Sequence, residues 1–98
     1  MKAVFFVEKE KYGSAKNRLY GDELVSRQSI TIRDNSSVEK EKEGYYMLLD
    51  GEDEAIKKAR EILKDSAKEL KDKEAKDIIG IIEKQESSAA DGFGAIFG

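Results

Sequence analysis

The spacing of the apolar residues changes once along this chain, and that change most strongly limits the folds open to it. Up to residue 49 the apolar residues stand in short runs or alternate with polar ones, which is typical of β-strands. From residue 56 they recur every three or four positions, which is typical of an amphipathic helix. A chain with strands first and helices afterwards is expected to fold as an α+β protein.

Three segments in the first half favour β-strands. Residues Ala3–Val7 form an uninterrupted apolar run, which suits a strand buried on both faces. The segment Ser29–Arg33 alternates apolar and polar residues, as a half-buried strand does, and Tyr45–Leu49 is a third candidate. Sequential strands usually lie side by side, so we expect the second and third to pair. Between the first and second strands, turn residues such as Gly13 and Asn17 predict one helical turn from Ser14 to Tyr20.

The second half predicts two amphipathic helices. The first apolar stripe comprises Ile56, Ala59, Ile62, Leu63, Ala67 and Leu70, and the second comprises Ala75, Ile78, Ile79 and Ile82. Gly80 interrupts the second stripe at a cost of about 1 kcal/mol relative to alanine, so a buried strand over residues 78–82 remains an alternative. We expect a small antiparallel or mixed sheet with both helices packed on one face.

A length of 98 residues indicates one domain. We expect residues 1–90 to form that α+β domain and residues 91–98 to form a tail rich in glycine and phenylalanine. The apolar runs are much shorter than the roughly 18 residues of a membrane span, and the N-terminus lacks the pattern of a signal peptide. The expected location is therefore cytoplasmic, without a membrane partner.

The chain contains neither histidine nor cysteine, which excludes several kinds of active site. Disulfides, thiolate zinc sites and cysteine nucleophiles need cysteine, and a Ser-His-Asp hydrolase needs a histidine base. We expect a protein that is not an enzyme, with catalysis by carboxylates and lysines left as an alternative. Any bound metal is expected to be a hard cation that prefers oxygen ligands.

Charged residues are numerous and interleaved, with 18 basic and 21 acidic side chains and a net charge of −3. Nucleic-acid binding is driven by clustered cations, so we expect no nucleic-acid partner. The abundance of Lys and Glu beside few Asn and Gln residues resembles the surface of a thermophilic protein.

Four carboxylates fall within five residues between the third strand and the first predicted helix, at Asp50, Glu52, Asp53 and Glu54. Ca²⁺ binds six to eight oxygen atoms on a flexible loop, so this segment predicts a weak Ca²⁺ site. If the second and third strands pair, Asp22 and Glu23 lie at the same end and complete it. The alternative is capping, because acidic side chains also stabilise the first turn of a helix.

The end of the chain places Phe93, Ile96 and Phe97 among glycines, and Gly92 is expected to end the helix before them. One interpretation is a terminus that folds back onto the sheet or frays. The other is an apolar surface that binds a protein partner or a second subunit, since exposed aromatic and aliphatic side chains favour burial.

Three segments together resemble a small family of proteins from methanogenic archaea. They are the opening run Ala-Val-Phe-Phe-Val, the segment Tyr-Tyr-Met-Leu-Leu-Asp-Gly and the ending Gly-Phe-Gly-Ala-Ile-Phe-Gly. The resemblance implies an α+β fold and an unassigned cellular function. It also implies calcium binding through acidic loops, here at Asp50, Glu52, Asp53 and Glu54.

Overall fold

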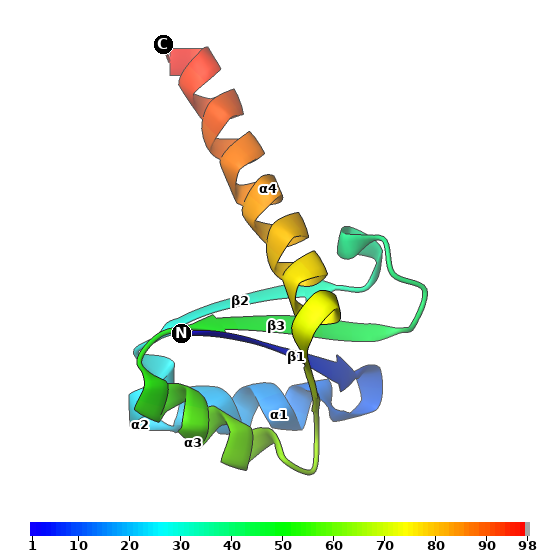
Figure 1. Ribbon diagram of the computed structural model, residues 1–98, viewed down its shortest axis with the longest axis vertical. Coiled ribbons are helices and arrows are strands. Elements are labelled where there is room, and N and C mark those ends of the chain that lie inside the picture. Colours follow the sequence, from blue (N-terminus) through cyan, green and yellow to red (C-terminus); the bar gives the residue numbers. More distant parts are fainter. Residues whose placement is uncertain (98) are drawn as a thin grey trace.

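Four antiparallel strands form the centre of the fold, and helices lie on both of their faces (Figure 1). The computed structural model describes the backbone of residues 1–97 and the side chains of residues 1–87. In chain order the elements are β1 (Lys2–Glu8), α1 (Lys9–Gly21), α2 (Glu23–Ser26), β2 (Ser29–Asp34), the 3₁₀ helix η1 (Ser36–Val38), β3 (Gly44–Asp50), α3 (Asp53–Leu63), β4 (Lys68–Leu70) and α4 (Asp72–Phe97). The predicted α+β class is confirmed.

The strands follow the order β2-β3-β1-β4 across the sheet. The expected pairing of the second and third strands is confirmed, with Ile30 opposite Leu49 and Ile32 opposite Met47. Strand β1 lies between β3 and β4 and pairs with both, so its apolar run has neighbours on each side.

Alternate residues of β1 enter two separate cores. Phe5 packs in the core that α1, α2 and α3 cover, whereas Phe6 packs in the core that α4 covers. Every residue from Ala3 to Val7 is buried, because helices close both faces of this strand. The prediction that β1 is buried on both faces is confirmed.

The expectation that both C-terminal helices pack on one face is wrong. Ile56 of α3 lies in the first core and Ile82 of α4 lies in the second, on the opposite side of the sheet. The cause is β4, a segment that the sequence predicts to be the end of the preceding helix. The chain leaves α3 at Leu63, pairs with the edge of β1 through Leu70, and emerges on the other face. Three residues are too few to display a strand period.

Helix α1 is also longer than the single turn expected from Ser14 to Tyr20. It spans 13 residues and buries only Ala15 and Leu19 completely. Two fully buried positions make a weak apolar stripe, and Gly13 and Asn17 disfavour a helix locally. Packing against the sheet therefore outweighs the local preference of this segment.

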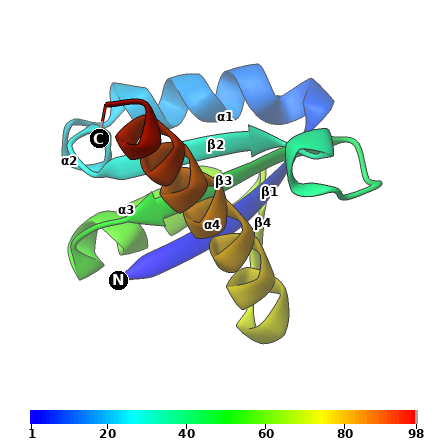
Figure 2. The same cartoon turned by 90° about the horizontal axis from the view of Figure 1, so that it is seen from above.

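Helix α4 contains residues 78–82, so the alternative of a buried strand there is wrong. Ile78 and Ile82, four positions apart, face the sheet, and Gly80 is exposed with open space around its α-carbon. The helix continues past Gly92 to Phe97 instead of ending there. Its second half projects away from the body (Figure 1), and seen from above the helix crosses over the strands (Figure 2). The molecule accordingly measures 44 × 30 × 25 Å.

Candidate functional site

The two acidic segments predicted to form a Ca²⁺ site do lie at the same end of the sheet. The side-chain oxygen of Gln28 accepts a hydrogen bond from the backbone N–H of Glu52, at 3.3 Å. On the same side, Lys58 Nζ of α3 lies 3.8 Å from Asp22 Oδ2. The inference that pairing of β2 with β3 brings these loops together is therefore correct.

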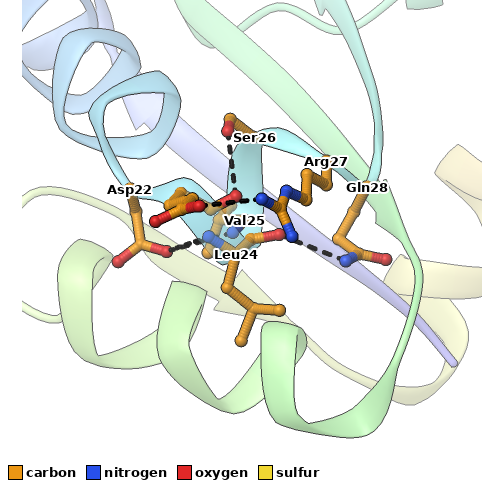
Figure 3. A network of polar contacts seen from close by, with 7 residues as sticks. Asp22, Leu24, Val25, Ser26, Arg27 and Gln28 are labelled. Carbon is orange, nitrogen blue, oxygen red and sulfur yellow. Dashed lines mark hydrogen bonds and ion pairs between the residues drawn. The ribbon is translucent and has the colours of Figure 1, made fainter.

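At this end of the sheet, the carboxylates of Asp22 and Glu23 already have protein partners. Asp22 Oδ1 accepts hydrogen bonds from the backbone N–H groups of Leu24 and Val25, both at 3.0 Å, and so caps α2 (Figure 3). Glu23 pairs with Arg27, with Nη2 2.7 Å from Oε1. Side-chain capping, which the sequence suggests for the Asp50 segment, is found instead at Asp22, whose oxygen satisfies N–H groups that the helix leaves without partners.

The second segment places its acids along the start of α3. Asp50 ends β3 opposite Lys2, Glu52 occupies the N-cap position, and Asp53 and Glu54 form the first turn. All four are exposed, and Glu52 makes no side-chain capping bond. Among the residues the structure describes, no three acidic side chains converge in a way that would hold a metal ion. Their position suits the positive end of the helix dipole.

Ion pairs connect the first half of α4 to β1 and to the loop before β3. Lys2 Nζ lies 2.9 Å from Glu83 Oε2, and this hydrogen bond raises the pKa of Lys2 above its ordinary value. Lys40 Nζ lies 2.6 Å from Asp77 Oδ2, and that contact likewise raises the pKa of Lys40. These contacts supplement the burial of Ile78 and Ile82.

A further contact crosses to the edge strand. Arg33 Nε of β2 donates to Gln85 Oε1 at 3.0 Å, and Gln85 Nε2 donates to the carbonyl oxygen of Ser37 at 2.7 Å. Gln85 thus joins β2 and η1 to α4. Together with the ion pairs of Lys2 and Lys40, it connects the first half of α4 to the body.

The predicted partner-binding residues Phe93, Ile96 and Phe97 have side chains outside the described residues. Their backbone belongs to the projecting half of α4. Partner binding by these residues stays a prediction, as does the division between residues 1–90 and 91–98.

One hollow was not predicted from the sequence. It measures about 240 Å³ and lies where the end of β1 meets the start of α1 and the α3–β4 loop; it is lined by Phe6, Glu8, Lys11, Lys42, Asp65, Ser66, Ala67 and Lys68. Its three lysines lie far apart in the sequence and in no recognised motif. The pairing of β1 with both β3 and β4 brings them together, so no local feature of the sequence predicts this hollow.

Comparisons with known proteins identify no relative of this chain. No protein-family model matches it, and no curated protein or solved structure does. The resemblance to the methanogen family therefore stays a prediction. In residues 1–97, no helix combines the length and the apolar character that crossing a membrane requires.

Proposed function

We propose that this chain is a non-catalytic interaction module that pairs with a second copy of itself through the projecting half of α4. The proposal rests on a difference between the two halves of this 26-residue helix. Its first half is anchored to the sheet by buried isoleucines and polar contacts, whereas its second half extends beyond the body (Figure 1).

The sequence of the projecting half supports burial against a partner. Residues 88–97 contain one charged residue, Asp91, beside Phe93, Ile96 and Phe97. Gly92 and Gly94 each lower helix stability by about 1 kcal/mol relative to alanine. A helix of this composition gains most of its stability from packing against another surface rather than from its own propensity.

A second copy is the partner that best suits this stretch. A second copy carries the same apolar residues and has no lysine or arginine after Lys84, and the burial of apolar side chains favours association. The small residues allow close approach of two helices, and identical surfaces pair about a two-fold axis. Ten helical residues span about 15 Å, so the contact is small and the dimer should dissociate on dilution.

Sedimentation equilibrium over a range of concentrations tests this proposal. The chain has a mass of 11.0 kDa, and we expect the average mass to rise toward twice that value with concentration. Phe93→Ser should hold the protein at the monomer mass. Gly80→Ala lies on the same helix but at an exposed position, and should leave self-association unchanged. A wild-type protein that stays monomeric at every concentration overturns the proposal.

We also propose, as a second function, weak Ca²⁺ binding at the acidic end of the sheet. The observation that favours it is the closeness of the Asp22 and Glu52 segments. A cation there would compete with Lys58 and with the cap of α2. Titration with Ca²⁺ followed by NMR should move the amide signals of residues 50–54, and the double variant Asp53→Asn, Glu54→Gln should abolish the change. Unchanged signals at millimolar Ca²⁺ would exclude this function.

A further inference from the structure

The two edges of the sheet differ in length and in charge. Strand β4, at one edge, has three residues and carries Lys68 and Glu69, whereas β2, at the other edge, has six residues. Proteins protect free edges with short strands, charged side chains or proline, because an unpaired edge binds further strands. Strand β2 has charged residues only at its end, Arg33 and Asp34, and the chain contains no proline. Of the two edges, β2 is therefore the one suited to accept another strand.

The backbone groups that face this open edge belong to Ile30 and Ile32. Asn35, the residue after β2, donates its N–H to the carbonyl oxygen of Gly44 in β3, at 2.9 Å. Successive residues of an antiparallel strand alternately point their backbone groups toward the paired strand and away from it. By this alternation Thr31 bonds to β3, whereas Ile30 and Ile32 point their N–H and C=O groups outward.

The outward side of β2 is incompletely bonded and incompletely buried. Among the described residues, the N–H groups of Ile30 and Ile32 have no hydrogen-bond partner. The carbonyl oxygen of Ile32 accepts one hydrogen bond, from Arg33 Nη1 at 3.0 Å, and a carbonyl oxygen can accept two. Both isoleucines are only half-buried, although Leu49 and Met47 opposite them in β3 are fully buried. A further strand would complete both the bonding and the burial.

Helix α4 runs across the sheet to this edge and continues beyond it. It begins at Asp72, close after β4, and reaches β2 at Gln85, whose Oε1 accepts a hydrogen bond from Arg33 Nε at 3.0 Å. Seen from above, the helix crosses over β2 (Figure 2). Phe93 follows Ile82 by eleven positions, about three helical turns, so the spacing of the sheet-facing stripe continues in the projecting half. A strand added to β2 would lie beneath this half of α4.

The sequence of β2 is complementary to itself about a two-fold axis. If two copies pair antiparallel with Thr31 opposite Thr31, Ile30 of each copy lies opposite Ile32 of the other. The outward N–H and C=O groups of the isoleucines then bond to each other on both sides of the axis, and their side chains share one face of the sheet. The two threonines form a favourable cross-strand pair, and Arg33 lies opposite the uncharged Ser29.

We propose that two copies of the chain pair their β2 strands antiparallel in this register and form one continuous sheet. This inference rests on the proposed association through α4 and adds the second part of the same surface. The helical contact alone is small, because ten residues span only about 15 Å, whereas specific interfaces bury roughly 1,200 Å² or more. A second copy suits the edge better than an extended peptide does, since a second copy also brings another α4.

Substitutions at Ser29 test the register, because this exposed residue would lie opposite Arg33 of the second copy. In sedimentation equilibrium, Ser29→Glu should strengthen dimerisation by about threefold to tenfold, and Ser29→Lys should weaken it by a similar factor. Within one copy Ser29 lies opposite Asp50, so Ser29→Glu should lower the melting temperature slightly and Ser29→Lys should raise it.

The expected order of dimerisation is thus opposite to the order of stability. It is also opposite to the effect of net charge, because Ser29→Glu makes an already acidic chain more negative. The reverse order, or equal dimerisation of the two variants, would overturn the proposed register.

Amide hydrogen exchange of the full chain separates strand pairing from association through α4 alone. Exchange at Ile30 and Ile32 should slow by about tenfold or more as the dimer forms, while Thr31, bonded to β3 in both states, should change less. A mass that doubles while the Ile30 and Ile32 amides stay unprotected would support the association through α4 and overturn strand pairing. Protection that persists in a dimer of Phe93→Ser would support strand pairing and overturn the role of α4. A monomeric wild type would overturn both.

Discussion

Arg60 and Glu69 form a two-pronged ion pair, with Nε 2.9 Å from Oε1 and Nη2 3.0 Å from Oε2. Residues nine positions apart in a continuous helix are separated by about 13.5 Å along its axis. The pair therefore exists only because the chain leaves α3 at Leu63 and returns as β4. It joins the helix of one layer to the strand that carries the chain to the other face.

We expect Arg60→Lys to lower the free energy of unfolding by about 0.5–1 kcal/mol, because an ammonium group cannot bond both carboxylate oxygens in this planar geometry. Urea unfolding measures the change, and a double-mutant cycle with Glu69→Gln isolates the pair. Arg27→Lys is the matched control, since Arg27 and Glu23 are exposed and should contribute less. Equal losses at the two sites would show that the geometry of the Arg60 pair adds nothing.

Ile82→Ala should lower the free energy of unfolding by about 2–4 kcal/mol, because the side chain is fully buried in the core beneath α4. Ile79 lies on the same helix but is only half-buried, so Ile79→Ala should cost clearly less. Denaturant titrations of the two variants compare the two positions directly. If the two losses are equal, α4 does not present the Ile78–Ile82 face to the sheet.

Gly44→Ala should be strongly destabilising, by about 2 kcal/mol or more. Gly44 has a φ angle of +155°, and a methyl group there would lie 2.5 Å from the carbonyl oxygen of Val7 and 2.6 Å from Phe6 Cζ. Gly13→Ala is the contrasting variant, because Gly13 lies in α1 with open space around it and should gain up to about 1 kcal/mol. Thermal unfolding of both proteins checks that the two changes have opposite signs.

Asp34 should contribute to the acid sensitivity of the protein. Hydrogen bonds from the side chain and backbone N–H of Ser37, and from the hydroxyl of Ser36, hold the pKa of this carboxyl below its ordinary value. A lowered pKa in the folded state means that the ionised form stabilises the fold above the unfolded-state pKa, about 4. That stability is lost as the pH falls from there through the folded-state pKa.

Melting temperatures of wild type and Asp34→Asn, recorded from pH 6 to about pH 2, test this contribution. The variant should be less stable near neutral pH, and the difference should shrink as the pH falls below about 4. Two curves that stay parallel over the whole range would show that the ionisation of Asp34 is not linked to folding.

Elements with a clear apolar period were predictable from the sequence, and elements that depend on distant contacts were not. The strand at Ala3–Val7 follows from its apolar run, and the pairing of the second and third strands follows from their nearness in the chain. Strand β4 was missed because Leu70 continues the helical spacing of the preceding stripe. Helix α1 was underestimated because the sheet, rather than its own residues, stabilises it.

The same distinction applies to the candidate sites. The acidic residues at Asp50–Glu54 are conspicuous in the sequence because they are adjacent, yet the structure places them at the end of β3 and the start of α3. The residues that line the hollow beside β1 are inconspicuous because Lys11, Lys42 and Lys68 are scattered along the chain. Residues that are adjacent in the sequence can be recognised as a cluster without a structure. Distant side chains come together only when the sheet has formed.

The sequence by itself determined the fold class, the two long amphipathic stripes and the absence of histidine and cysteine chemistry. Only the tertiary structure decided which face of the sheet each stripe covers. An apolar stripe such as Ile78 and Ile82 must be buried, but it packs equally well against either apolar face. Because β4 lies at the edge of the sheet beside β1, the chain crosses the sheet there. Helix α4 therefore packs on the face opposite α3.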